Sequence, residues 1–296
     1  MAGVERGEVL WGPLDSPTQA GRFLDHVRSN IDSKVTDYAS LHAWSVTEPA
    51  RFWGLVSSWF DVTWHTKPRE VMMATTEMIG TTWWPGGELN FAERVFEMAA
   101  GHEDEVAIIA YSDSRPSVEL TWRRLLSLVS HYQDVLTGHG VRTGDRVVAF
   151  LPNIPETIAI FLACAATGVA FSSCPPEFGE DAVISRFSQI EPVLLFFVDR
   201  YRYGSRDFDK SEIVGRIAAA LPKLRAVERI EMSSIDEMIE HSSSDQEPEV
   251  VAVPSEHPLY ILYSSGTTGL PKPIIHGHAG IIHEHVKIMA LHHDLA

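Results

Sequence analysis

Cysteine and basic residues are scarce in this sequence of 296 residues, which holds 2 cysteines and 24 lysines and arginines against 40 aspartates and glutamates. Two cysteines, Cys164 and Cys174, cannot form a disulfide framework, so a reducing compartment is expected. The formal net charge of −16 repels a phosphate backbone, and we expect no nucleic-acid partner. A small phosphate ligand remains compatible with this net charge, because its binding depends on the charged and polar groups of its pocket rather than on the net charge of the protein.

Long hydrophobic runs and an N-terminal targeting pattern are also missing. The most apolar run, 158–171, contains Gly168 and is shorter than the roughly 20 residues that a membrane-spanning helix needs. The N-terminus carries acidic residues and lacks a basic segment followed by an apolar one. The sequence therefore predicts a cytoplasmic protein without a signal peptide or a membrane span.

The pattern of apolar residues changes along the chain. Residues 16–60 are helical in pattern and rich in aromatic residues, and Pro49 suits the first turn of a helix that continues through Phe60. Residues 61–90 show little periodicity. From Asn90 onward, helical and β-rich stretches alternate. Because apolar strands separated by helices favour a parallel sheet, we predict an α/β fold: a parallel-rich sheet with helices on both faces, preceded by an aromatic-rich helical cap.

The expected elements can be given as ranges. Helices are expected at 91–100 with Asn90 as N-cap, at 122–136 with Thr121 as N-cap, and at 155–167, 181–190, 213–221 and from about 280. Strands are expected at 106–111, 146–151, 169–173, 193–198, 227–231, 259–263 and 273–276.

The segment that carries chemistry lies between the last two of these strands. Residues 264–272 read SSGTTGLPK and are called the phosphate loop below. Glycine permits close backbone approach, hydroxyl and backbone N–H groups donate hydrogen bonds, and the lysine adds a positive charge, a combination that suits a polyphosphate. The candidate phosphate-binding residues are Ser264, Ser265, Gly266, Thr267, Thr268, Gly269 and Lys272.

The phosphate loop departs from the Walker pattern, in which Gly-Lys-Ser/Thr opens a helix. Leu270 and Pro271 separate Gly269 from Lys272, and Pro273 follows, so the chain continues extended. The alternative interpretation is a polar surface turn, since short Gly/Ser/Thr clusters are common. The strands on both sides favour the phosphate-binding interpretation.

The phosphate loop resembles the signature of the adenylate-forming superfamily, Thr/Ser-Ser-Gly-Ser/Thr-Thr-Gly-x-Pro-Lys. Most members have glycine after the lysine, whereas Pro273 followed by IIHGHAG is similar to the acetoacetyl-CoA synthetase branch. Residues 37–46 and 52–53 resemble the N-terminal cap shared by acetyl- and acetoacetyl-CoA synthetases, and 144–147 and 151–156 resemble the superfamily as a whole. The most branch-specific stretches lie at 172–179 and 186–192. Pro175 and Glu177 depart from the branch pattern, which has Ser and Asp there.

The resemblance implies an AMP-forming acetoacetate–CoA ligase that uses ATP, Mg²⁺ and CoA and proceeds through an acyl-adenylate. By analogy, Thr267, Thr268 and Lys272 would hold the β- and γ-phosphates with Mg²⁺ bridging, and Lys272 and Thr268 would be catalytic. The partners implied are small molecules: ATP, CoA and acetoacetate or another short carboxylic acid.

The resemblance also implies a domain organisation. Residues 1–90 would be the N-terminal cap of the acetyl/acetoacetyl-CoA synthetase type, and 91–296 an incomplete AMP-binding domain, with the C-terminal domain absent. We therefore expect an N-terminal fragment that is inactive alone and prone to aggregation at its open sheet edge. The alternative is a non-catalytic truncated paralogue that binds nucleotide weakly or acts as an interaction protein.

Other candidate residues are weaker. Six histidines crowd the C-terminal stretch, but they lack the His-Glu-x-x-His spacing of a zinc helix, and no metal ligand is predicted. They are His276, His278, His283, His285, His292 and His293, and exposed or helix-packing roles are favoured. Cys174 has no readable partner base and is expected to be a buried thiol.

Overall fold

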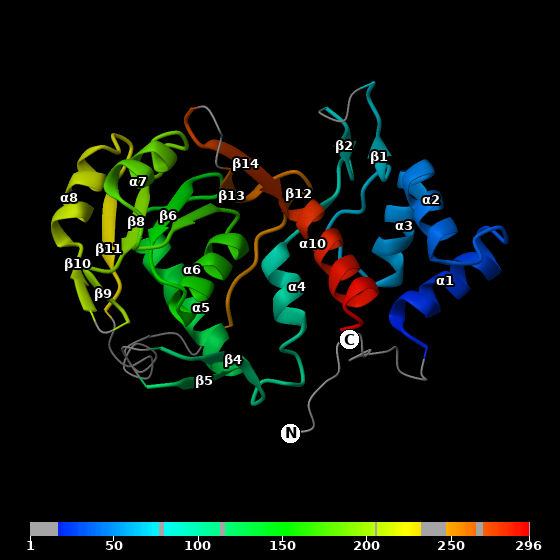
Figure 1. Ribbon diagram of the computed structural model, residues 1–296, viewed down its shortest axis with the longest axis horizontal. Helices are drawn as coiled ribbons and strands as arrows, with labels where there is room; N and C mark the ends of the chain where they lie inside the picture. The colour runs from blue at the N-terminus through cyan, green and yellow to red at the C-terminus, as the bar shows by residue number, and fades with distance from the viewer. Residues whose placement is uncertain are drawn as a thin grey trace, which may run out of the picture. The chain divides into compact units, whose positions relative to one another are not determined.

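The computed structural model describes residues 17–76, 80–112, 116–204, 206–231, 247–264 and 269–295 (Figure 1). The chain divides into two compact units, of which the described parts are 17–62 with 282–295 and 63–281 without the gaps named above. Each unit has its own hydrophobic core. The expected boundary at residue 90 between a cap and an AMP-binding domain stays a prediction.

The smaller unit is helical, as its sequence predicts. It contains α1 (Gln19–Asn30), α2 (Tyr38–Thr47), α3 (Pro49–Trp59) and the π-helical turn η1 (Lys287–His292), which follows α10 (His278–Val286). The hydroxyl of Thr18 accepts the Gly21 N–H at the start of α1, and Asp37 and Ser40 form a capping box at the start of α2. Pro49 opens α3, where its missing N–H costs no helical hydrogen bond.

Aromatic side chains form the core of the smaller unit. The ring of Phe23 lies edge-to-face against Phe52 at 6.1 Å and against Trp59 at 5.6 Å between centroids, and Trp44 meets Phe52 in the same way at 6.1 Å. Such geometry aligns the positive edge of one ring with the negative face of the next. Most aromatic residues of 16–60 therefore serve packing within this unit, whereas Tyr38 is exposed.

A twisted sheet forms the centre of the larger unit. Its strands are β6 (Arg146–Phe150), β7 (Ala170–Cys174), β8 (Leu194–Phe197), β11 (Ala226–Arg229), β13 (Pro258–Ser264) and β14 (Lys272–Gly277), in the order β11-β8-β6-β7-β13-β14. All neighbouring pairs are parallel except β13 and β14, which are antiparallel. The predicted parallel-rich α/β sheet is confirmed.

Helices cover both faces of this sheet (Figure 1). On one face lie α4 (Phe91–Glu97), α5 (Trp122–Gly138) and α6 (Pro155–Ala166), and on the other α7 (Glu180–Phe187) and α8 (Ser211–Ala219). Side chains alternate along each strand, so Val147 and Ala149 of β6 join the first core while Val148 and Phe150 join the second. Burial on both faces explains why these strands read as continuous apolar runs.

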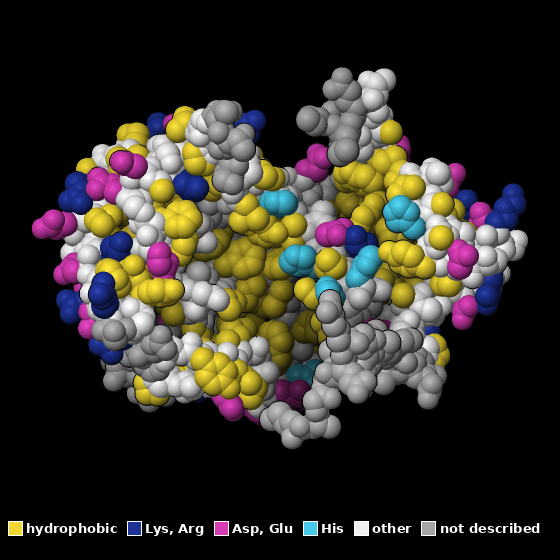
Figure 2. All heavy atoms as spheres, viewed as in Figure 1, with side chains coloured by type: hydrophobic (Ala, Val, Ile, Leu, Met, Phe, Trp, Pro, Cys, Tyr) yellow, Lys and Arg dark blue, Asp and Glu magenta, His cyan; other side chains and the backbone are white. Residues whose placement is uncertain are grey.

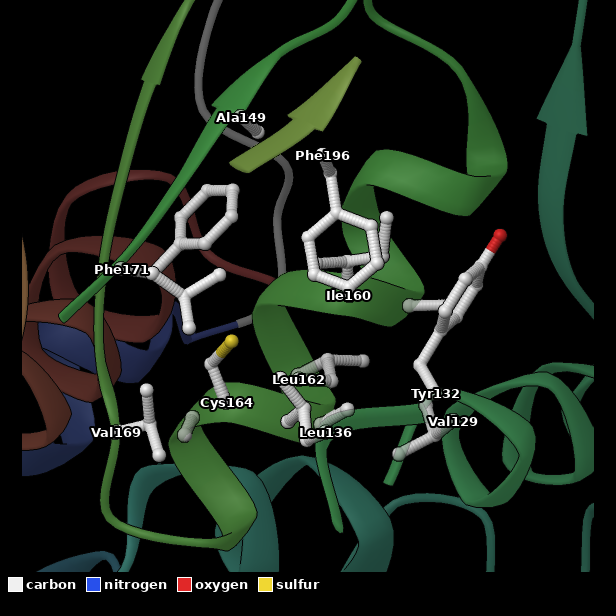
Figure 3. Packing of buried hydrophobic residues seen from close by; sticks show 14 of the residues in the cluster. Val129, Tyr132, Leu136, Ala149, Ile160, Leu162, Cys164, Val169, Phe171 and Phe196 are labelled. Atoms are coloured by element: carbon white, nitrogen blue, oxygen red, sulfur yellow. The ribbon is translucent and has the colours of Figure 1, made fainter. Parts of the chain in front are cut away.

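Figure 3 shows the first core, where Tyr132 of α5 and Ile160 of α6 meet Phe171 and Phe196 of the sheet. Each large apolar side chain that is fully buried contributes about 1.5–3 kcal/mol relative to exposure. Cys164 lies within this core and is free. No helix in the described part of the chain is long and apolar enough to cross a bilayer.

Short antiparallel strand pairs are the part of the fold that the sequence did not reveal. They are β1 (Met72–Met73) with β2 (Thr82–Trp83), β3 (Glu88–Leu89) with β12 (Val253–Pro254), β4 (Val106–Ala110) with β5 (Val118–Thr121), and β9 (Arg200–Tyr203) with β10 (Arg206–Asp209). Of these only β4 was expected. The others are short and mostly exposed, so they give a weak signal in the sequence. Between β9 and β10 the backbone ladder is accompanied by stacked rings of Tyr201 and Phe208 at 5.1 Å and by an exposed ion pair of Arg202 with Asp207 at 2.7 Å.

The expected helix and strand boundaries hold within a few residues. Asn90 and Thr121 are the N-caps of α4 and α5, with side chains that accept backbone N–H groups. The first of these helices ends earlier than predicted, at Glu97 instead of residue 100. The amides of Ala99 and Ala100 bond three residues back, so the helix tightens into turns before Gly101, whose φ is +80°.

Candidate functional site

The phosphate loop connects two strands that pair with each other. Ser264, the last residue of β13, lies opposite Lys272, the first residue of β14, so the loop is closed at its base by the ladder. Both residues are exposed, and Gly269 has a φ of +145°, which favours glycine. Ser265, Gly266, Thr267 and Thr268 lie outside the described residues.

The sheet fixes where the loop begins. β13 runs parallel to β7, with Tyr260 opposite Phe171, and the buried hydroxyl of Ser172 donates to the Ile261 carbonyl at 2.7 Å. The loop thus emerges at the carboxyl end of a parallel strand. In open α/β sheets ligands bind at this edge, because helix N-termini and connecting loops converge there.

Ser264 and Lys272 belong to the same face of the strand pair. Directly paired residues share a face, and Tyr260, Leu262 and Ser264 alternate with Ile261 and Tyr263, which join the α7 side. On the face of Ser264 and Lys272 lies a shallow, open apolar groove of about 220 Å³. It is lined by Phe161, Phe171, Ser172, Ser173, Tyr260, Ile261 and Leu262. Hydrophobic side chains gather beside α6 and β13 in the space-filling view (Figure 2).

Lys272 is available to a ligand. Its side chain is exposed, and within the described ranges it forms no ion pair with a carboxylate. A lysine ammonium without a partner is a compact charge with three donors, which binds phosphate oxygens readily. Lys272 and Ser264 therefore bring a cation and a hydroxyl together at the base of the phosphate loop.

The residues beneath the loop stay protonated near neutral pH. Burial raises the pKa of Tyr263 to about 12, and the neighbouring Cys174 adds to the rise. Burial also raises the pKa of Cys174 to about 11, so its thiol is protonated and is a poor nucleophile. Burial raises the pKa of Cys164 as well. Both cysteines are buried and free, which supports the packing interpretation.

Sequence reasoning missed the role of His278. Its ring is fully buried, and its Nδ1 accepts the backbone N–H of Phe91 at 3.1 Å, while its centroid lies 5.9 Å from that of His257. Burial, with a smaller contribution from His257, lowers the pKa of His278 to about 3. The residue is a neutral hydrogen-bond acceptor at the start of α4. No local pattern could have indicated this, because the partner is 187 residues away.

Potential metal ligands do not cluster in the described ranges: no group of three or more His, Cys, Asp or Glu residues is arranged to bind a metal ion. The histidines near the C-terminus are dispersed instead. His276 packs on the ring of Tyr260 at 5.0 Å, and His292 and His293 are exposed.

Comparison with known families agrees with this geometry. The family described as AMP-binding enzyme matches residues 95–295, and the family described as acetyl-coenzyme A synthetase N-terminus matches residues 38–95. The phosphate loop and the whole parallel sheet lie in the first of these ranges.

Individual relatives extend the likeness to nearly the full chain. An acetoacetyl-coenzyme A synthetase of Rhizobium meliloti (strain 1021) is 33% identical over 96% of this chain and 45% of its own length. A malonamoyl-CoA synthetase of Penicillium aethiopicum is 30% identical over 97% of this chain and 43% of its own. The chain spans about half the length of the curated relatives it matches.

A solved structure gives the same result in three dimensions. The acetoacetyl-CoA synthetase from Streptomyces lividans superimposes with a TM-score of 0.86 at 39% identity, covering 94% of this chain and 44% of that one. The sheet with helices on both faces thus matches the N-terminal region of an adenylate-forming enzyme. The chain belongs to the AMP-binding enzyme family.

Proposed function

We propose that this chain serves the ATP-dependent formation of acetoacetyl-CoA. In the first step acetoacetate reacts with ATP to give an acyl-adenylate and pyrophosphate, and in the second the CoA thiol takes the acyl group and AMP is released. The observation that carries the proposal is the phosphate loop between β13 and β14 in a fold that matches a solved acetoacetyl-CoA synthetase. The acid is the one named for several relatives, and the malonamoyl-CoA synthetase indicates that other short acids fit related sites.

The loop's residues would act through electrostatics. Negative charge develops on the pyrophosphate as it leaves, and donors fixed before the reaction stabilise that charge without having to reorganise. Lys272 would contribute a full positive charge, and Ser264, Ser265, Thr267 and Thr268 would contribute hydroxyl donors, with Gly266 and Gly269 permitting close approach. The nucleotide enters as its Mg²⁺ complex, so the ion belongs to the substrate.

Lys272 is the first residue of β14, and strand pairing limits the conformational freedom of its backbone. Ladder pairing with Ser264 fixes the backbone of Lys272, so only the side chain must be ordered when the phosphates bind. Thr268 remains a proposed second catalytic residue on the strength of the motif.

Nucleotide binding tests the phosphate-loop assignment directly. We expect titration calorimetry with Mg·ATP to show binding that Lys272→Met weakens about tenfold or more, since methionine keeps the length and removes the charge. The matched control is Lys223→Met, which removes an exposed lysine outside the sheet edge and should leave affinity unchanged. An absence of Mg·ATP binding to the unmodified chain would contradict the proposal.

Acid activation is a separate assay. Acetoacetate-dependent exchange of labelled pyrophosphate into ATP, compared with acetate and malonamate, reports adenylation and identifies the acid. We expect the native protein to prefer acetoacetate. Exchange with acetate alone would show that the substrate assignment is wrong while leaving the phosphate-loop assignment intact.

A further inference from the structure

The end of α7 and the turn that follows it contact the chain at both ends of the phosphate loop. The phenol of Tyr263, one residue before the loop, donates to the Arg186 carbonyl at 2.8 Å. The side-chain amide of Gln189 donates to the carbonyl of Pro271, one residue before Lys272, at 2.9 Å. These contacts join residues 77 and 82 positions apart in the sequence, and they come from the same short stretch of chain.

The helix terminus explains why these contacts form. The last carbonyls of a helix have no partner within the helix and must find one elsewhere. The Arg186 carbonyl accepts the backbone N–H of Gln189 at 3.2 Å and the hydroxyl of Tyr263 at 2.8 Å, and the Gln189 side chain also donates to the Ser185 carbonyl at 2.6 Å. The Gln189 amide therefore joins the end of α7 to the start of β14.

The entry to the loop is held by further packing. The Arg186 guanidinium lies 5.1 Å from the centroid of Phe178 and 5.9 Å from that of Tyr263. Tyr263 is thereby fixed by its ring as well as by its hydroxyl. At the exit from the loop, the described residues provide one side-chain hydrogen bond besides the strand ladder, that of the exposed Gln189 to the Pro271 carbonyl. Loss of Gln189 should therefore loosen this end of the loop.

We propose that Gln189 is a positioning residue for the phosphate loop: its amide holds the Pro271 carbonyl and so sets the backbone from which Lys272 reaches the nucleotide phosphates. This inference rests on the proposed function. A loop whose ends are fixed before binding loses less conformational freedom when the ligand arrives, which raises affinity without a direct contact. Gln189 lies within 186–192, the stretch RFSQIEP, which the ATP-dependent reaction otherwise leaves without a role.

Three variants separate hydrogen bonding from bulk. Gln189→Ala removes the side chain, and Gln189→Met keeps its length and adds no charge but has no group that can donate to the Pro271 carbonyl. The control is Ser188→Ala, which removes a neighbouring exposed hydroxyl that, among the described residues, bonds to the Ile184 carbonyl in α7. A role in packing alone would leave Gln189→Met close to the unmodified protein.

Two readouts are needed. Hydrogen exchange in the absence of nucleotide, measured on a peptide covering 263–272, should be several-fold faster in both Gln189 variants and unchanged in Ser188→Ala. Titration with Mg·ATP should show about fivefold weaker binding for both Gln189 variants, the size expected for one exposed hydrogen bond.

The outcomes are distinguishable. If the unmodified protein binds Mg·ATP and the Gln189 variants bind equally well, the inference is overturned and the proposed function stands. If the unmodified protein binds no nucleotide, the proposed function fails. Amide hydrogen exchange measured without nucleotide then still tests whether Gln189 positions the loop. If exchange at 263–272 is the same in the Gln189 variants and the unmodified protein, Gln189 does not position it.

Discussion

The buried imidazole of His278 accepts the backbone N–H of Phe91 through Nδ1 at 3.1 Å, and thereby joins the first residue of α10 to the first residue of α4. Phe91 N–H is one of the helix-terminal donors that no residue within α4 can satisfy. A protonated imidazole has no acceptor nitrogen, so this contact requires the neutral ring.

Acid should therefore destabilise the larger unit through His278. Its pKa is about 3 when folded against 6.5 when unfolded, so between these values the unfolded chain binds more protons. The contribution is fully present above pH 6.5 and is lost at about 1.4 kcal/mol per pH unit as the pH falls toward 3. Urea unfolding at pH 7.5, 6.0 and 5.0 measures the slope.

The variant His278→Asn isolates this effect. Asparagine keeps an oxygen that can accept the Phe91 N–H and does not titrate, so the slope between pH 6.5 and 5 should flatten by about 1 kcal/mol per unit. His293→Asn, which removes an exposed histidine, should keep the original slope. Equal slopes for His278→Asn and the unmodified protein would show that the ring does not titrate as described.

Asn90 should be sensitive to the chemistry of its side chain. Its oxygen accepts the Ala92 N–H at 2.8 Å, and its nitrogen donates to the Ala165 and Val251 carbonyls at 2.9 and 2.8 Å. Asn90→Asp keeps the cap but directs a carboxylate at two carbonyls, so we expect a loss of about 3 kcal/mol or more in the free energy of unfolding.

Asn90→Ser separates the two roles, because serine also caps a helix but cannot reach both carbonyls. It should cost less than Asn90→Asp, about 2 kcal/mol, in the same urea experiment. Asp37→Asn at the exposed start of α2 should change stability by only a few tenths of a kcal/mol. If Asn90→Asp were as stable as the unmodified chain, the hydrogen bonds from the Asn90 side-chain nitrogen to the Ala165 and Val251 carbonyls would contribute nothing measurable to stability.

Gly168, in the turn between α6 and β7, should not tolerate a side chain. Its φ is +68°, and a Cβ atom there would lie 2.8 Å from Thr143 Cγ2 and 2.9 Å from Val253 Cγ1. Gly168→Ala combines backbone strain of about 1–2 kcal/mol with overpacking of about 1–3 kcal/mol. Thermal unfolding should therefore show a clearly lower midpoint.

Gly144→Ala is the matched control for strain alone. Gly144 has a φ of +86°, and a Cβ there meets nothing within 4 Å. It should lower stability by about 1–2 kcal/mol, less than Gly168→Ala. Equal effects of the two substitutions would show that the contacts with Thr143 and Val253 relax without cost.

The β14 edge should promote self-association. β14 ends the strand order among the described residues, and Leu262, Ile274 and Ile275 are 51%, 45% and 61% exposed. Exposed apolar side chains beside unpaired backbone groups favour edge-to-edge pairing. Ile275→Lys should shift sedimentation-velocity profiles toward the monomer.

Val46→Lys provides the comparison, because Val46 is similarly exposed, at 62%, on helix α2, which offers no strand edge. It should leave the association state unchanged. A monomeric unmodified chain at all concentrations would contradict the prediction of an adhesive edge.

Local features of this protein can be predicted from its amino-acid sequence. Pro49 opens a helix and Thr121 caps one for reasons contained within a few residues, and the apolar runs of β6 and β8 indicate burial on both faces. The phosphate loop is also local, since its glycines, hydroxyls and lysine are contiguous. Such features are readable because propensity, capping and periodicity act over short separations.

Which residues far apart in the sequence contact these features can be seen only in the tertiary structure. Gln189 meets Pro271 across 82 residues and His278 meets Phe91 across 187, and neither pair has a spacing that a local pattern encodes. The β9–β10 pair escaped prediction because each of its strands has four residues that are mostly exposed, so the sequence shows no buried face for them. Contacts of this kind depend on the order of strands in the sheet, which packing settles only when the whole unit folds.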